Sequence, residues 1–151
     1  MKNDPIPPQD HISRWCKPSQ IDNGIVGSSA FMLGTNDIDD ALSVNWLEFF
    51  GYADRDREIA EIQHILSLKM IEIKKTSRIA VLNVGQSLDA IEKLLSGKLN
   101  VTVLHNPDRE EGRWEDPSHA SIYGLTRDDD SQTAATALCD SIIDLYPATP
   151  S

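Results

Sequence analysis

Two short segments of the chain hold side chains that can carry out acid–base chemistry or bind a phosphate. Residues 10–17 read Asp-His-Ile-Ser-Arg-Trp-Cys-Lys, and residues 116–124 read Asp-Pro-Ser-His-Ala-Ser-Ile-Tyr-Gly. Each contains one histidine, His11 or His119, and imidazole titrates near neutral pH. Hydroxyl, guanidinium and ammonium groups in the same segments can hold an anionic substrate. Both segments are therefore candidate sites.

The two segments also share a His-x-Ser tripeptide, at 11–13 and at 119–121. The pair resembles the doubled signature of the two-histidine phosphoesterases, and the resemblance covers these two tripeptides only. It implies that both tripeptides lie on strands facing one cleft, with one histidine as general base and the other as general acid. The serines, two positions on, would face the same way and hold the phosphate. The candidate residues are His11 and His119 for catalysis, with Ser13, Arg14 and Ser121 for substrate binding.

Each segment also has a purely structural interpretation. Residues 10–17 show neither a helical nor a strand period, and an ordered arm with Trp15 inserted in the core is the alternative for them. In the second segment, Asp116-Pro117 is typical of a turn and places His119 at the start of a strand, where a neighbouring acid can satisfy it. A third, weaker candidate is an anion site at Gly85, for which we favour a tight turn.

Other chemistry lacks a motif. The sequence contains no Gly-rich phosphate loop ending in Lys-Ser/Thr, no Gly-x-Ser-x-Gly, and no histidine or cysteine pair at zinc-ligand spacing. We therefore expect no metal and no cofactor. Two cysteines, Cys16 and Cys139, are too few for a disulfide framework, and we expect both to be free thiols.

The net charge of −10 limits the classes of binding partner that are expected. Residues 35–61 carry eight acids and two arginines, and residues 106–130 carry eight acids and three arginines. Such a field repels a phosphate backbone, so extended nucleic acid is not expected as a partner. It provides solubility and would also favour a basic protein partner.

The hydrophobic pattern predicts alternating elements. Strands are expected at 25–33, 42–46, 79–84 and 101–104, and helices begin near Asp54, Ser87 and Ser131, the last ending at Pro147. Residues 79–84 are apolar on both faces, as in an interior strand, whereas Ser43 and Asn45 would face outward and could line a cleft. Residues 79–104 form a βαβ unit, so the fold is α+β: a mixed β-sheet with about three packed helices. The 151 residues form a single domain, extended or frayed at about 1–10 and 147–151.

Two functions from different classes follow. The first is a small enzyme that acts on a phosphorylated small molecule or nucleotide by histidine acid–base chemistry. The alternative is an acidic interaction protein, similar to an immunity protein or antitoxin, that binds a basic protein partner. No apolar run approaches the roughly 18 residues that span a bilayer, and the N-terminus lacks the apolar core of a signal peptide, so we expect a cytoplasmic protein without membrane contact.

Overall fold

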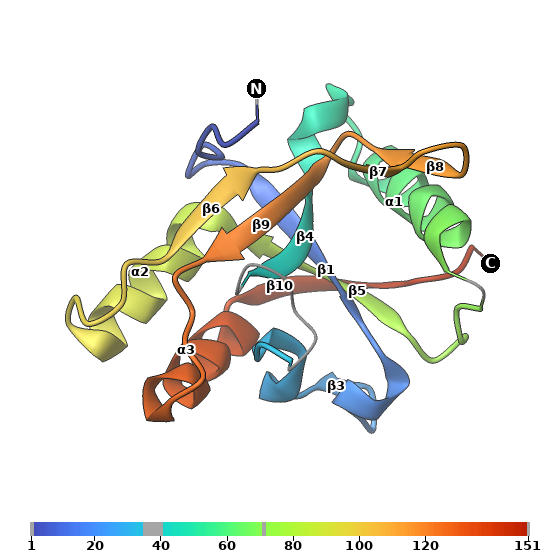
Figure 1. Cartoon of the computed structure of the whole chain (residues 1–151). Helices are drawn as coiled ribbons and strands as arrows, with labels where there is room; N and C mark the ends of the chain where they lie inside the picture. The colour runs from blue at the N-terminus through green and yellow to red at the C-terminus, as the bar shows by residue number, and fades with distance from the viewer. Residues whose placement is uncertain (1, 35–40, 71, 151) are drawn as a thin grey trace.

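A six-stranded sheet forms the centre of the protein in the computed structural model, which describes residues 2–34, 41–70 and 72–150. The strand order is β10-β5-β1-β4-β9-β6, and every neighbouring pair is antiparallel (Figure 1). The strands are β1 (His11–Cys16), β4 (Leu42–Trp46), β5 (Arg78–Asn83), β6 (Thr102–His105), β9 (His119–Tyr123) and β10 (Ile142–Pro147). Three helices pack on this sheet: α1 (Arg55–Lys69), α2 (Val84–Leu95) and α3 (Asp129–Asp140).

The α+β class with three helices is confirmed, but the mixed sheet is wrong. Strands β5 and β6 do run in the same direction with α2 between them, as a βαβ unit requires, yet β1, β4 and β9 lie between them in the sheet. Both edges of β5 are taken by antiparallel partners, β1 and β10. The length of the α2 connection permits a crossover, but it does not decide which strands become neighbours.

The helix starts follow from capping side chains. Asp54 caps α1, as expected, because its carboxylate accepts from the amide of Asp56 at 2.9 Å. The expected cap at Ser87 is wrong. Helix α2 begins four residues earlier, where the side chain of Asn83 accepts from the amide of Gln86, and the Ser87 hydroxyl donates to the Asn83 carbonyl from within the helix.

The end of the last helix is also corrected. Helix α3 begins after the cap Asp128 and ends at Asp140, and the residues after Ser141 form β10 along the outer edge of β5. Leu138, Ile142 and Leu145 recur at helical spacing, which suggested one continuous helix. Pairing of β10 with the edge of β5 outweighs that local pattern, since it provides a ladder of backbone hydrogen bonds.

The predicted strand at 25–33 is wrong as well. Among these residues only β3 (Ile25–Val26) is a strand, paired with β2 (Ile21–Asp22), and the 3-10 helix η2 (Ser28–Phe31) follows. Within residues 10–17, which show no period, His11–Cys16 form the interior strand β1 instead of an arm. The remaining elements are η1 (Pro18–Gln20), η4 (Leu47–Phe50), β7 (Asp108–Glu110) and β8 (Trp114–Asp116).

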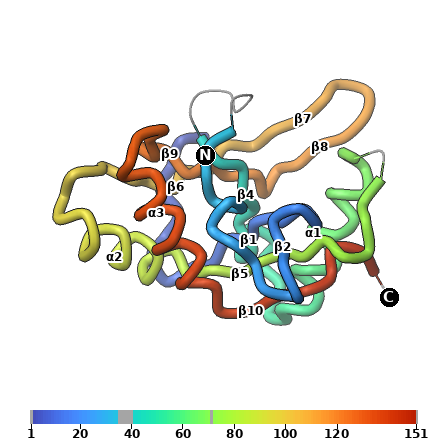
Figure 2. The backbone as a smooth tube through the Cα atoms, turned by 90° about the horizontal axis from the view of Figure 1, so that it is seen from below, coloured from blue at the N-terminus to red at the C-terminus, as the bar shows by residue number. Residues whose placement is uncertain are grey.

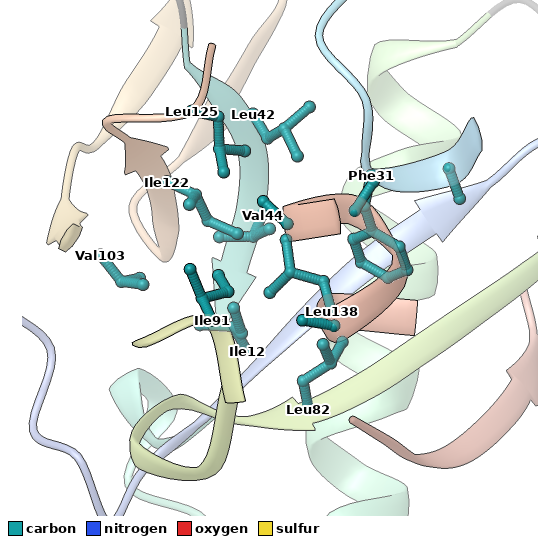
Figure 3. Close-up of a cluster of buried hydrophobic side chains, with 14 of the residues drawn as sticks. Ile12, Phe31, Leu42, Val44, Leu82, Ile91, Val103, Ile122, Leu125 and Leu138 are labelled. Atoms are coloured by element: carbon teal, nitrogen blue, oxygen red, sulfur yellow. The ribbon is translucent and has the colours of Figure 1, made fainter. Parts of the chain in front are cut away.

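Two hydrophobic clusters pack on opposite faces of the sheet. Figure 3 shows the larger, between the sheet and the paired helices α2 and α3, and it includes Ile12, Leu82, Ile91 and Leu138. The smaller packs under α1 and includes Ile62, Ile79 and Val81. Because Val81 and Leu82 are adjacent in β5 and face different clusters, this strand is apolar on both faces, as the sequence indicated.

The β7–β8 hairpin extends from the sheet beside α1 (Figures 1 and 2). At the N-terminus, Pro5 forms a bridge with Leu104, and Ile6 is buried in the larger cluster. Within the part of the chain that the structure describes, no helix has both the length and the apolar character needed to cross a membrane.

Candidate functional site

Strands β1 and β4 separate in the middle of the sheet. They pair only at Ile12–Trp46 and Ser13–Asn45, although each strand continues further. Beyond this point the guanidinium of Arg14 takes the place of a backbone partner: Nε donates to the Ala30 carbonyl at 2.9 Å and Nη1 to the Ser43 carbonyl at 2.8 Å. The side chain of Arg14 thus bridges the gap between the two strands.

A cleft of about 360 Å³ opens beside this gap. Its walls come from the sheet, from the C-terminal end of α1 and from the β7–β8 hairpin. The lining residues are Arg14, Trp15, Lys17, Gln20, Ser43, Asn45, Leu66, Lys69, Met70, Asp108, Trp114 and His119. Small-molecule sites span roughly 300–1,000 Å³, so this cleft is of the size that holds one small ligand.

Three polar residues form a row across the sheet at this cleft, and two of them, Asn45 and His119, line it. Ser13, Asn45 and His119 lie opposite one another on the adjacent strands β1, β4 and β9. Residues opposite one another in a sheet point to the same face, and that face is the one covered by α1. The cleft therefore lies on the α1 side of the sheet.

A buried carboxylate, Asp116, lies next to the cleft and binds two of its lining residues, Asn45 and Lys69. The side-chain amide of Asn45 donates to both oxygens of Asp116, at 2.8 and 3.0 Å, and to the hydroxyl of Ser118 at 2.9 Å. The Ser118 hydroxyl donates in turn to Asp116, and the ammonium of Lys69 forms a close ion pair with it. Asp116 is fully buried, and these three donors satisfy the charge that burial would otherwise make very unfavourable.

Lys69 connects this network to the hairpin. It occupies the last turn of α1, where a cation is favoured by the helix dipole, and its Nζ lies 4.8 Å from the centre of the Trp114 ring. The cleft lining holds three cationic residues and one carboxylate, and Asp116 behind it contributes one more negative charge. The charges of these five groups thus sum to +1, in a protein whose net charge is −10.

His119 is positioned as a proton acceptor. It is 6% exposed, and its Nδ1 lies 2.7 Å from the carbonyl oxygen of Asn106. A carbonyl can only accept, so Nδ1 carries a proton and the lone pair of the neutral ring is on Nε2. Within the described residues Nε2 has no hydrogen-bond partner, and it is not among the side-chain atoms shut off from solvent, so it is open to the cleft.

The pKa of His119 is lowered, chiefly because burial disfavours the charged ring. The ammonium of Lys69 lowers it further, while the Asn106 carbonyl and the carboxylates of Asp116 and Asp108 oppose the shift. The imidazole is therefore neutral at pH 7 and able to accept a proton.

Two hydrogen bonds of Asn106 hold His119 in place. The side-chain amide of Asn106 donates to the hydroxyl of Ser121 at 3.0 Å, and the backbone carbonyl of Asn106 accepts from the His119 ring. Ser121 is 3% exposed and does not line the cleft. Its position two residues after His119 therefore orients the imidazole through Asn106.

His11 lies on the same face of the sheet but is held elsewhere. Its Nδ1 lies 2.6 Å from Oε2 of Glu48, and its backbone N–H donates to Oε1 of the same carboxylate at 2.7 Å. It is not among the described residues that line the cleft, and neither is Ser13, which is 2% exposed. Arg14 and His119 both contribute to the cleft lining, but the guanidinium of Arg14 donates to the Ala30 and Ser43 carbonyls, and His11 is held by Glu48.

Most residues of this site are not among the five candidates that the sequence indicated, and the central ones are Asn45, Lys69, Trp114 and Asp116. The sequence pattern could indicate Asn45, since a polar residue on the outward face of an alternating strand can line a cleft. It could not indicate Lys69, because a lysine at a helix end is ordinarily solvated.

No metal centre accompanies the cleft: in the described ranges, no three His, Cys, Asp or Glu residues are grouped closely enough to hold an ion. Comparisons with protein families, curated proteins and solved structures find no match to this chain.

Proposed function

We propose that the cleft binds a small phosphorylated molecule and that His119 exchanges a proton with it. The observation that carries this proposal is a neutral, buried imidazole with its free Nε2 open to a locally positive cleft. Lys17 supplies a cationic group for a phosphate, and Arg14 and Lys69, which already hold partners within the protein, add their positive charge nearby.

The chemistry that fits is general base catalysis of phosphoester cleavage. Nε2 of His119 removes the proton from an attacking hydroxyl, whose oxygen bonds to phosphorus while the ester P–O bond breaks. The leaving oxygen takes a proton from water, and the cationic groups balance the charge on the phosphoryl oxygens. His11 has no part in this proposal, because Glu48 binds both its ring and its amide.

Phosphate binding tests the proposal directly. Titration with inorganic phosphate and with phenyl phosphate, followed by NMR, should shift the ring signals of His119 and leave those of the exposed His64 in α1 unchanged. His119→Gln should abolish phosphoester turnover, and the matched control His64→Gln should retain it. No binding of either probe, or full turnover by His119→Gln, would overturn the proposal.

An acidic binding surface is the second candidate. The β7–β8 hairpin exposes Asp108, Glu110, Glu111 and Glu115, with Arg109 and Arg113 among them. The net charge of these six exposed residues is −2, and a basic protein could pair with them in a salt-sensitive way. Salt-sensitive binding of polylysine that is lost on Glu110→Gln/Glu111→Gln, together with no phosphate binding, would favour this candidate.

We also propose that the protein acts in a reducing compartment such as the cytoplasm. Both Cys16 and Cys139 are free, the first buried and the second half-buried. Free thiols persist where glutathione and thioredoxin keep them reduced.

A further inference from the structure

We infer that the ligand carries a planar aromatic ring beside its phosphate, as a mononucleotide does, and that Trp15 and Trp114 are the surfaces against which this ring stacks. This inference rests on the proposed function and names its substrate class. It starts from the finding that two of the three tryptophans in the chain line the same small cleft.

Trp15 is fixed in β1 opposite Ile79, on the face of the sheet that α1 covers. It follows Arg14 in β1, is half-buried, and packs against the smaller hydrophobic cluster. Its Nε1 is buried without a hydrogen-bond partner among the described residues, so this edge of the indole points into the protein. Trp15 lines the cleft and also a neighbouring hollow that includes Lys17 and Lys74.

Trp114 is held from the opposite wall by two contacts. Its Nε1 donates to Oε2 of Glu110 at 3.0 Å, and the ammonium of Lys69 lies 4.8 Å from its ring centre. An indole fixed at its edge and beside a cation loses little freedom when a ligand stacks on it. Lys69 thereby links the aromatic wall to the positive part of the cleft.

Size and charge restrict the ligand to one nucleotide unit. A cleft of about 360 Å³ is near the lower end for small-molecule sites, which suits one ring with one phosphate. The net charge of −10 disfavours a longer phosphate backbone. Stacking on an aromatic side chain stabilises any nucleobase, because every base has a π-face.

Polar groups of the same cleft suit the edge of a base. The Asn45 amide nitrogen is committed to Asp116 and Ser118, so Asn45 offers its Oδ1 as an acceptor for an amino group. The exposed Ser43 is its neighbour on this face of β4 and can donate or accept. A sugar phosphate would use the cations but leave both indoles without a partner.

Tryptophan fluorescence with a graded set of probes tests the inference. The probes are inorganic phosphate, ribose 5-phosphate, adenosine and AMP. We expect AMP to quench the fluorescence and to bind at least fivefold more tightly than ribose 5-phosphate. Equal affinity for AMP and ribose 5-phosphate would overturn the inference while leaving the proposed phosphate site intact.

A variant tests where the aromatic ring of the ligand binds. Trp114 lies in the hairpin, outside both hydrophobic clusters. Trp114→Leu should weaken AMP binding at least fivefold, with less than a twofold change in the affinity for inorganic phosphate. The control is Phe49→Leu, an exposed aromatic residue that does not line the cleft. An equal loss for AMP and phosphate in Trp114→Leu would overturn the stacking role. If the variant fails to fold, the wild-type ratio of AMP to ribose 5-phosphate affinities still decides. If adenosine binds but inorganic phosphate does not, the proposed function is overturned.

Discussion

The side-chain nitrogen of Asn45 lies 2.8 Å from Oδ1 of Asp116, although the two residues are 71 positions apart in the chain. Asn45 is in a central strand, and Asp116 ends the β7–β8 hairpin. Their contact, together with the ion pair from Lys69, fixes the hairpin and the end of α1 to the sheet. The walls of the cleft are thus held by one buried carboxylate.

Replacing this carboxylate should be costly. Asp116→Ala leaves the ammonium of Lys69 and the amide of Asn45 without their partner in a buried place, and we expect a loss of about 3–5 kcal/mol in the free energy of unfolding. The control is Glu110→Gln, which breaks an exposed ion pair with Arg113 and should cost less than about 1 kcal/mol. Urea unfolding measures both, and equal losses would show that Asp116 contributes no more than a surface charge.

Val81 should be a major contributor to stability, because it is fully buried in β5 between two antiparallel neighbours. Val81→Ala leaves a cavity and should lower the free energy of unfolding by about 2 kcal/mol. Asn100 is exposed, so Asn100→Ala should cost much less. Similar small losses in chemical denaturation would contradict the central position of β5 in the core.

Position 124 requires glycine for two reasons: its backbone has a positive φ, and there is no room for a Cβ atom. Its φ is +94°, and a Cβ atom there would lie 2.1 Å from the backbone oxygen of Asn100. Gly124→Ala should therefore destabilise the protein by about 4 kcal/mol or more. Gly112 has a φ of +79° with no atom within 4 Å, so Gly112→Ala isolates the conformational strain and should cost about 1–2 kcal/mol. Thermal unfolding of the two variants separates the effects, and equal shifts would show that the backbone at Asn100 gives way.

The two thiols should differ in reactivity. Burial raises the pKa of Cys16 to about 11, so that at pH 8 only about one molecule in a thousand carries the thiolate. Burial also raises the pKa of Cys139, but this residue is half-buried and accessible to reagent. Native protein should react with a thiol reagent at one position, slowly, and at two after denaturation. Native Cys139→Ser should show no reaction, and labelling of Cys16 in that folded variant would contradict this assignment.

The sequence was informative wherever the local pattern was also the tertiary one. Residues 79–84 are apolar on both faces and form an interior strand, and Asp54 precedes an apolar helical period and caps α1. It was misleading at Ile142, where a helical spacing continues into a strand. Strand order is set by long-range pairing and side-chain packing, which no local period encodes.

The site shows the same division. His119 at the start of a strand could be found from its turn and its neighbours. Lys69 could not, because its role depends on Asp116, 47 residues away. The sequence indicates Arg14 as a phosphate ligand, but its contact with the Ser43 carbonyl arises only because two strands separate there.

The buried imidazole of His119 should make stability depend on pH. Its pKa in the folded protein is below the ordinary value of 6.5, so between these two pKa values the unfolded chain binds more protons than the native protein. The contribution of the neutral ring is complete above about pH 7 and is lost as the pH falls through 6.5 toward the lowered native pKa.

His119→Gln keeps a donor for the Asn106 carbonyl and removes this titration. The difference in free energy of unfolding between wild type and His119→Gln should therefore shrink between pH 7.5 and pH 5, by at most about 1.4 kcal/mol per pH unit. Urea titrations at several pH values measure it, and the exposed His64→Gln should follow the wild-type profile. A His119→Gln profile parallel to that of the wild type would show that this ring has the same pKa in both states and would contradict the lowered pKa.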